Sequence, residues 1–139
     1  MEDESKNFVG RVAQKAIIEK EGKVLLMRNR GRQKWELPGG RLQVGETPAE
    51  GLAREIKEEF GVPIIVKEPL TTGTFVLART QEPHFFVVYI CELTEPEKEF
   101  TLDPQEVEEA RWVSRDEMAP LDIWEQFREA LEVYFGKQS

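Results

Sequence analysis

A run of apolar residues from His84 to Leu93, HFFVVYICEL, is the feature that most limits how this chain can fold. Strands that are covered on both faces are apolar almost throughout, whereas strands with one wet face alternate apolar and polar residues. The run therefore predicts a central strand with a packed layer on each side. A sheet that lies between two layers of helices meets this requirement.

The remaining secondary structure is predicted from turn and periodicity signals. Residues 9–18 and 23–29 read as a hairpin, because Gly22 between them can take the positive φ that a tight turn needs. An amphipathic pattern over 122–135 predicts a terminal helix. Further strands are expected at 41–45, twice within 62–80, and at 108–113. The predicted fold class is α/β (α+β), with a mixed β-sheet sandwiched between α-helices.

Another helix, over residues 48–60, is marked at both ends. Thr47 is a good N-cap, Pro48 suits the first helical position, and Glu50 completes a capping box with Thr47. Gly61 is a residue that can end a helix in the left-handed conformation. We therefore assign Gly61 a structural role.

Composition indicates a globular protein and limits its partners. The 139 residues show no repeat and no flexible linker, so residues 1–139 are expected to form one domain, with residues 1–8 as a flexible tail. The formal charge of -8 argues against stable nucleic-acid binding, since an acidic surface repels phosphate backbones. The single cysteine, Cys91, lies in an apolar run, and the N-terminus lacks an apolar signal segment. A cytoplasmic protein without a membrane span is expected, and a homodimer is left open.

Three glutamates of the helix over 48–60 lie on one side of it. At about 100° per residue, Glu55, Glu58 and Glu59 fall within an arc of roughly 100°, next to the apolar stripe that must face the sheet. Like charges at this spacing repel one another, and Arg54 can pair with only one or two of them. Oxygen ligands without a nearby His or Cys favour a hard divalent cation, so Mg²⁺ or Mn²⁺ is the expected counter-ion. A solvated acidic face is the alternative.

A glycine-rich loop, LPGG at residues 37–40, stands upstream of these acids and gives backbone groups close access to a ligand. Residues 40–62, GRLQVGETPAEGLAREIKEEFGV, resemble the Nudix box: Gly, five residues, Glu, seven residues, then Arg-Glu-aliphatic-any-Glu-Glu-any-Gly-aliphatic. Every fixed position of the box is filled, by Gly40, Glu46, Arg54, Glu55, Ile56, Glu58, Glu59, Gly61 and Val62.

The resemblance implies the Nudix fold and hydrolysis of a nucleoside diphosphate that is linked to another moiety. It implies that Arg54, Glu55, Glu58 and Glu59 are the catalytic residues. The three glutamates would bind the divalent ions, and Arg54 would orient them by ion pairing. The metal would polarise the phosphate and activate a water whose proton a glutamate accepts.

The loop before the helix and a later acidic segment supply further candidates. By the resemblance, Glu46 supports the loop, and a backbone carbonyl of the Gly39-Gly40 pair adds a metal ligand, with both glycines close to the substrate. The segment DPQEVEEARWV is similar to a region where many Nudix enzymes supply another carboxylate. Glu106 is the favoured metal ligand there and Glu109 is its rival, and plain surface acids are an equal alternative.

Outside these segments, other residues are candidates for contact with the nucleotide. Arg28 and Arg30 are substrate-binding candidates that can clamp phosphate, although a solvated strand edge is an equal alternative. Trp35 and Trp124 can stack on a base, although aromatic residues more often lie in the core. His84 is given a structural or peripheral role and not that of a general base.

The favoured substrate is a nucleoside or deoxynucleoside triphosphate, cleaved to the monophosphate and pyrophosphate. Ala78 stands where ADP-ribose hydrolases of the family carry a proline, and the tyrosine of dinucleoside-polyphosphate enzymes is not found. The alternatives are hydrolysis of ADP-ribose or a dinucleotide, hydrolysis of an RNA 5′-end pyrophosphate, and a non-catalytic nucleotide-sensing module. RNA binding would need a basic surface, and a sensing module would usually lose box glutamates.

Overall fold

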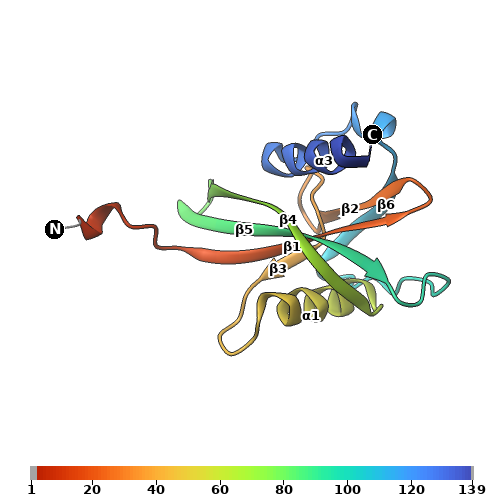
Figure 1. Cartoon of the computed structure of the whole chain (residues 1–139), viewed down its shortest axis with the longest axis horizontal. Helices are drawn as coiled ribbons and strands as arrows, with labels where there is room; N and C mark the ends of the chain where they lie inside the picture. The colour runs from red at the N-terminus through yellow and green to blue at the C-terminus, as the bar shows by residue number, and fades with distance from the viewer. Residues whose placement is uncertain (1–2, 139) are drawn as a thin grey trace.

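The computed structural model describes residues 3–138 and consists of a mixed six-stranded sheet with helices on both faces (Figure 1). The strand order is β4-β5-β1-β2-β6, and the short strand β3 pairs with β1 beside this path. Strand β1 runs parallel to β5 and antiparallel to β2 and β3. The strands are β1 Arg11–Lys20, β2 Lys23–Asn29, β3 Gly39–Arg41, β4 Ile64–Leu77, β5 Glu82–Leu93 and β6 Val107–Val113. The predicted fold class is confirmed.

The two long helices cover opposite faces of the sheet. Helix α1, Pro48–Phe60, lies below the sheet in Figure 1, and helix α3, Glu125–Gln138, lies above it. A short helix α2, Arg115–Met118, precedes α3, and a 3₁₀ turn η1 covers Glu4–Lys6. No helix within residues 3–138 is long and apolar enough to cross a membrane.

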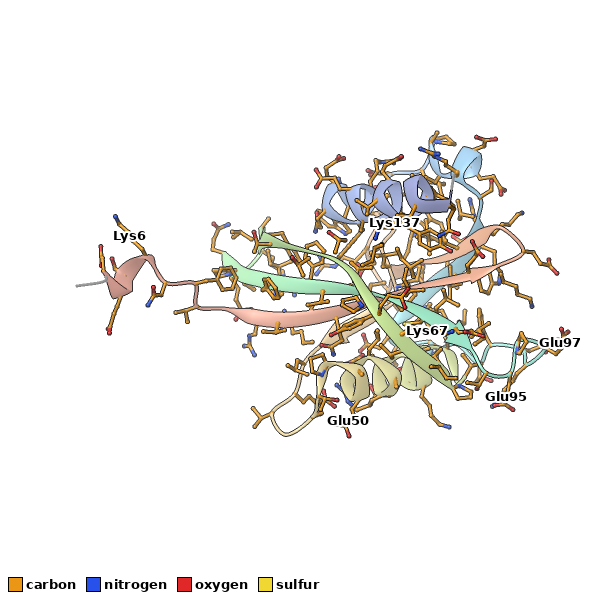
Figure 2. All side chains as sticks on the ribbon, viewed as in Figure 1. Lys6, Glu50, Lys67, Glu95, Glu97 and Lys137 are labelled. Atoms are coloured by element: carbon orange, nitrogen blue, oxygen red, sulfur yellow. The ribbon has the colours of Figure 1, made fainter. Side chains whose placement is uncertain are left out.

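The hydrophobic core consists of two clusters, one on each face of the sheet. Strand β5 contributes Phe86 and Val88 to the cluster under α3, and Cys91 to the cluster under α1. Figure 2 shows side chains filling both spaces between the sheet and the helices. Cys91 is buried, and burial raises the pKa of its thiol to about 12. The apolar run is therefore an interior strand covered on both faces, as its composition predicts.

Helix α1 begins and ends at the predicted residues. The Thr47 hydroxyl accepts from the Glu50 backbone N–H at 3.2 Å, and the Glu50 carboxylate accepts from the Thr47 N–H at 2.8 Å. At the other end Gly61 has φ 71° and donates its N–H to the Lys57 carbonyl. These two caps satisfy backbone groups that an α-helix leaves unpaired at its ends.

The prediction of two strands within 62–80 is wrong, because β4 is one strand of 14 residues. Its pairing with β5 shifts register on both sides of Pro69. Proline is tolerated at irregular positions of an edge strand, and β4 lies at the edge of the sheet. Gly73 does not break the strand either, and the Phe86 ring occupies the space that a Cβ at this position would need.

Smaller differences concern the two ends of the chain. The terminal helix starts at Glu125 instead of at 122, because Trp35 pairs with Ile123 in an isolated bridge. Helix α2 was not predicted, although Ser114 and Glu117 form a capping box that marks its start. Of the predicted tail over residues 1–8, the first two residues lie outside the described part and the exposed turn η1 occupies Glu4–Lys6.

Candidate active site

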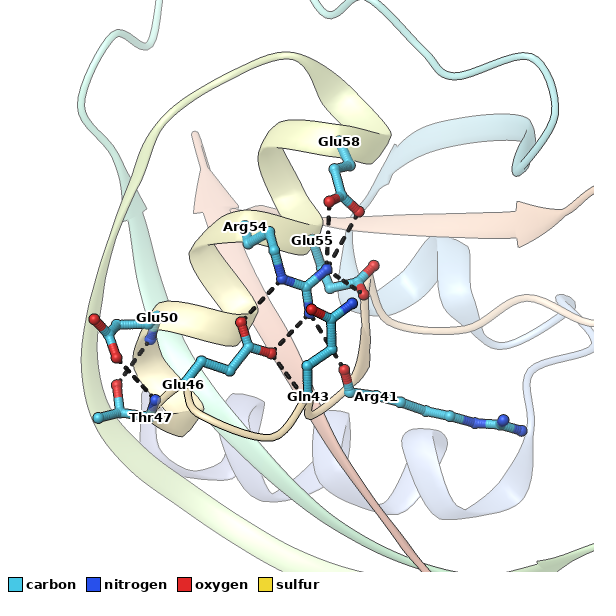
Figure 3. Close-up of polar contacts among 8 residues, drawn as sticks. All are labelled: Arg41, Gln43, Glu46, Thr47, Glu50, Arg54, Glu55 and Glu58. Atoms are coloured by element: carbon cyan, nitrogen blue, oxygen red, sulfur yellow. Dashed lines mark hydrogen bonds and ion pairs between the residues drawn. The ribbon is translucent and has the colours of Figure 1, made fainter.

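Arg54 on helix α1 binds Glu55 and Glu58 of the acidic face, and also Glu46 of the loop before the helix (Figure 3). Its Nη2 and Nε donate to the two carboxylate oxygens of Glu46 at 2.8 and 3.0 Å. Its Nη1 donates to Glu55 at 3.0 Å and to both oxygens of Glu58 at 3.3 Å. One guanidinium therefore neutralises part of the repulsion that the spacing of the acids creates. Of the three helix acids it pairs with two, Glu55 and Glu58, which agrees with the predicted one or two, and Glu46 from the loop is a further partner.

Glu46 ties the loop before α1 to the helix. Besides the two bonds from Arg54, its Oε1 accepts the backbone N–H of Gln43 at 2.8 Å. The hydrogen bonds from Arg54 and Gln43 lower the pKa of Glu46 to about 2. Glu46 is thus placed where a residue that supports the loop must lie.

Glu59 is the most buried of the acids, with 5% of its surface exposed. Its Oε1 accepts the backbone N–H of Gly39 at 3.2 Å, which joins the end of the helix to the glycine loop. Burial raises the pKa of Glu59 to about 8, and the nearby Glu55 acts in the same direction. A negative charge at this position therefore costs free energy unless a cation accompanies it.

Glu55 lies directly over Gly40. A Cβ atom at residue 40 would come within 2.6 Å of both carboxylate oxygens of Glu55, so only glycine leaves room for this carboxylate. Burial raises the pKa of Glu55, while Arg54 acts against the shift. The paired glycines therefore bring backbone to within contact distance of two of the acids.

In the part of the chain that the structure describes, no three His, Cys, Asp or Glu side chains are grouped so as to hold a metal ion. The carboxylates of Glu55 and Glu58 are instead paired with the Arg54 guanidinium. The Glu58 side chain is 56% exposed and has space to rotate. Binding of an ion by the three acids requires Glu55 and Glu58 to exchange part of their contact with Arg54.

A buried ion pair that the sequence interpretation missed lies beside the site. Lys15 Nζ donates to Glu36 at 2.8 Å, the other oxygen of Glu36 accepts from Asn29, and the Lys15 ammonium lies 5.2 Å from the Phe127 ring centroid. The positive charge of Lys15 also acts to lower the pKa of Glu59. The sequence did contain a signal for this ion pair. Lys15 lies among apolar residues of β1, and lysine is seldom buried without a partner.

The candidates outside the box lie along β2 and β6. Arg28 donates to Glu109 at 2.9 Å, and Arg30 pairs with Glu108. Glu106 is exposed, and its carbonyl accepts the Arg30 N–H. Among residues 3–138, no ion pair or side-chain hydrogen bond joins these residues to α1. The loop before Glu106 does reach the helix, because the Asp103 N–H donates to the Glu59 carbonyl at 3.0 Å.

The aromatic candidates and the histidine are largely part of the core. Trp35 is 6% exposed, and the guanidinium groups of Arg28 and Arg111 lie 5.4 and 4.9 Å from its ring centroid, so little of the ring is open to a base. Trp124 is half-buried with the Lys34 ammonium over its ring. His84 is buried and stacks on Phe75 at 4.8 Å between ring centroids. These surroundings agree with the structural alternatives.

Replacing Gly40 with alanine is expected to displace Glu55 without unfolding the protein. The new Cβ meets the far end of a flexible side chain, which can move at small cost. The nucleotide hydrolysis that the resemblance implies should fall at least about tenfold, while the free energy of unfolding should change by less than about 1 kcal/mol. Enzyme assays and urea unfolding of the same preparation measure the two effects.

Gly39→Ala is the matched comparison. Gly39 has φ 142°, and its Cβ would collide with the backbone carbonyl of Gln14, which cannot move without disturbing β1. This variant should lose stability as well as activity. Equal loss of stability in the two variants would contradict the account of Gly40.

Comparison with known proteins identifies the family. The family model described as NUDIX domain matches residues 10–134. A CTP pyrophosphohydrolase of Escherichia coli is 29% identical over 117 residues, which cover 78% of this chain and 82% of that protein. A MutT-like protein of Streptomyces ambofaciens is 41% identical over 59 residues, but the match covers only 42% of this chain and 37% of that protein.

The fold matches the same group of proteins. The crystal structure of the MutT protein from Methanosarcina mazei superposes with a TM-score of 0.79 at 26% identity, over 93% of this chain and 95% of that one. The family model spans most of the chain, and it includes the loop, the helix and the glutamates that Arg54 holds together. The chain therefore belongs to the Nudix family.

Proposed function

We propose that this protein is a pyrophosphohydrolase that cleaves a nucleoside or deoxynucleoside triphosphate to the monophosphate and pyrophosphate. The observation that carries the proposal is the set of contacts made by Arg54, which binds Glu46, Glu55 and Glu58 beside the buried Glu59. A solvated acidic face does not explain why one of its acids is buried. A cation-binding site explains this burial, because a bound cation offsets the cost of placing a carboxylate away from water.

The residues present fit a hard divalent cation, Mg²⁺ or Mn²⁺. Glu55, Glu58 and Glu59 offer carboxylate oxygens only, and Gly40 leaves room for one of these carboxylates beside the loop backbone. Burial disfavours the charges of Glu55 and Glu59 in the protein alone, as their raised pKa values indicate. When bound, the cation would supply charge neutralisation and polarisation of the phosphate.

The protein residues around the cation have separate tasks. Glu55, Glu58 and Glu59, with a carbonyl of Gly39, would hold the ion, and one of the glutamates would accept the proton of the attacking water. Arg54 would keep the carboxylates oriented through its hydrogen bonds. Glu46 would fix Arg54 from the loop side.

Residues in β2 and in the segments next to β2 and β6 would complete the site. We assign Glu106 as an additional ligand, because the preceding loop is held to the Glu59 carbonyl by the Asp103 N–H. Arg28 and Arg30 would bind substrate phosphate, which requires them to exchange Glu109 and Glu108 for the ligand. Gly39 and Gly40 would bring backbone close to the same phosphates.

The preference for a small nucleotide over RNA follows from charge. The chain has a formal charge of -8, so an extended RNA strand would be repelled over most of the surface. A nucleotide needs only local contacts and the metal. The nucleotide and not a nucleic acid is therefore the proposed partner.

Product analysis of a substrate panel tests the proposal. The metal-free protein is assayed with and without Mg²⁺ at alkaline pH against the four NTPs and four dNTPs, ADP-ribose, a dinucleoside polyphosphate and 5′-triphosphate RNA. We expect metal-dependent release of pyrophosphate and monophosphate from at least one triphosphate. Turnover of ADP-ribose, dinucleotide or RNA alone would replace the substrate assignment, and no turnover of any compound would reject the enzyme.

A further inference from the structure

Gln14 is a buried amide in strand β1 whose polar atoms are unsatisfied. Its side chain is 0% exposed, and neither Nε2 nor Oε1 has a hydrogen-bond partner within residues 3–138. Nearly all buried polar groups in proteins are paired, and an unpaired one costs free energy that an apolar side chain of the same size avoids. The amide at this position therefore requires an explanation other than packing.

The Gln14 side chain faces helix α1 next to the glutamates. Alternation along β1 places it on the same face as Ala16 and Ile18, which belong to the cluster under α1. Its partner in the pairing of β1 with β3 is Gly40, the residue over which the Glu55 carboxylate lies. Residues opposite each other in an antiparallel pair point to the same face, so Gln14 and Glu55 are neighbours.

Gly51 lies next to the side chains of both Gln14 and Glu46. A Cβ at Gly51 would lie 2.7 Å from Gln14 Nε2 and 2.7 Å from Glu46 Oε1. The two polar atoms are therefore separated by at most twice that distance. This separation is within the reach of a direct hydrogen bond after a small rotation, or of one bridging water.

Glu46 has acceptor capacity for this contact. A carboxylate has about four acceptor positions, and the contacts from Arg54 and Gln43 use three of them. The amide of Gln14 has two N–H donors and lacks an acceptor. The remaining position is on Oε2, because Oε1 already accepts from Arg54 Nη2 and from the Gln43 N–H, and the carboxylate carbon that joins the two oxygens would lie 3.1 Å from a Cβ at Gly51. The Gln14 amide and the Glu46 carboxylate therefore lie on the two sides of Gly51, which has no side chain to separate them.

We propose that Gln14 is a positioning residue of the active site: its amide donates to the Glu46 carboxylate, directly or through one internal water. Glu46 in turn orients Arg54, and Arg54 orients Glu55 and Glu58. The inference rests on the proposed function, because it assigns Gln14 to the support of the same glutamates. It links the sheet to the acidic face through a chain of hydrogen bonds that begins in β1.

The variant Gln14→Met tests the proposal, because methionine keeps the length of the side chain and removes the amide. Calorimetry should show Mg²⁺ binding about 3- to 10-fold weaker than in the wild type, a smaller change than the 10- to 100-fold seen for groups that touch metal ligands. The KM for nucleotide at saturating Mg²⁺ should stay the same. In the metal-free protein, the Arg54 Nε–H should exchange with solvent faster, as measured by ¹⁵N NMR.

Ile18→Met is the matched control, since Ile18 is equally buried on the same face of β1 and is not next to Glu46. It should change neither Mg²⁺ affinity nor Arg54 exchange. Should Gln14→Met fail to fold, Gly51→Ala serves instead, because the three atoms nearest to its Cβ are all at the ends of the Gln14 and Glu46 side chains. It should weaken Mg²⁺ binding in the same way.

A double-mutant cycle with Glu46→Gln separates positioning from packing. The proposal predicts that Gln14→Met has little further effect on Mg²⁺ affinity once Glu46 is changed, because both residues act through one contact. Additive effects would show that Gln14 acts by packing alone and would overturn the proposal, as would wild-type exchange of Arg54 in Gln14→Met. The exchange measurement needs no substrate, so it stands even if the substrate panel shows no turnover.

Discussion

Glu59→Gln is expected to lower kcat by more than about 100-fold while the protein keeps its fold. Loss of residues that only support metal ligands costs about 10- to 100-fold, so loss of a ligand carboxylate should cost more. Glutamine has the same shape and keeps an oxygen that can accept the Gly39 N–H. Lys57→Gln is the control, because Lys57 is exposed on the other side of the same helix and should leave kcat unchanged.

The stability of the metal-free Glu59→Gln protein distinguishes loss of chemistry from loss of fold. Burial raises the pKa of Glu59 from 4.5 to about 8, so between these values the folded protein holds a proton that the unfolded chain releases. This group therefore lowers the free energy of unfolding as the pH rises through that window. The variant lacks this titration and should be at least as stable as the wild type near pH 8. A less stable variant would contradict this account of Glu59.

Arg54→Ala is expected to lower the free energy of unfolding of the metal-free protein by about 2 to 4 kcal/mol. It leaves three carboxylates without their shared partner, and breaking a buried pair costs about 3 to 5 kcal/mol before allowance for partial exposure. The Arg54 side chain is 24% exposed, so part of that cost remains. The free energy of unfolding of Arg54→Lys should lie between those of the wild type and Arg54→Ala, because lysine keeps the charge but lacks the planar guanidinium.

The difference in free energy of unfolding between the wild type and Arg54→Ala should depend on pH if the ion pairs of Arg54 cause it. Arg54 and Gln43 hold the pKa of Glu46 at about 2, below its ordinary value of 4.5. The stabilisation is therefore complete above pH 4.5 and is lost as the pH falls toward 2. Urea unfolding between about pH 7 and pH 3 should show the two proteins converging in stability at the acid end. A difference that stays constant over this range would exclude the ion pairs as its cause.

The elements that local signals specify were predictable from the sequence. Helix α1 has a capping box at Thr47 and a left-handed glycine at Gly61, and it begins and ends where these residues indicate. Strand β5 is apolar because both of its faces are covered. The arc of the three acids follows from helix geometry alone, and Arg54 was expected among them.

What could not be predicted depends on contacts between distant segments. The continuity of β4 through Pro69 depends on its place at the sheet edge, which only the strand order reveals. The burial of Lys15 with Glu36 depends on the close approach of β1 and the glycine loop. The position of Gln14 beside Gly51 likewise joins segments far apart in the sequence, so periodicity carries no information about it.

The central claim is that the acidic face of α1 binds divalent cations. Calorimetric titration of the metal-free protein with Mg²⁺ and Mn²⁺, with and without a non-hydrolysable nucleotide, tests it most directly. The account predicts saturable binding of both ions that Lys57→Gln retains and Glu59→Gln largely loses. If neither Mg²⁺ nor Mn²⁺ binds to the wild-type protein, with or without the nucleotide, the central claim is wrong.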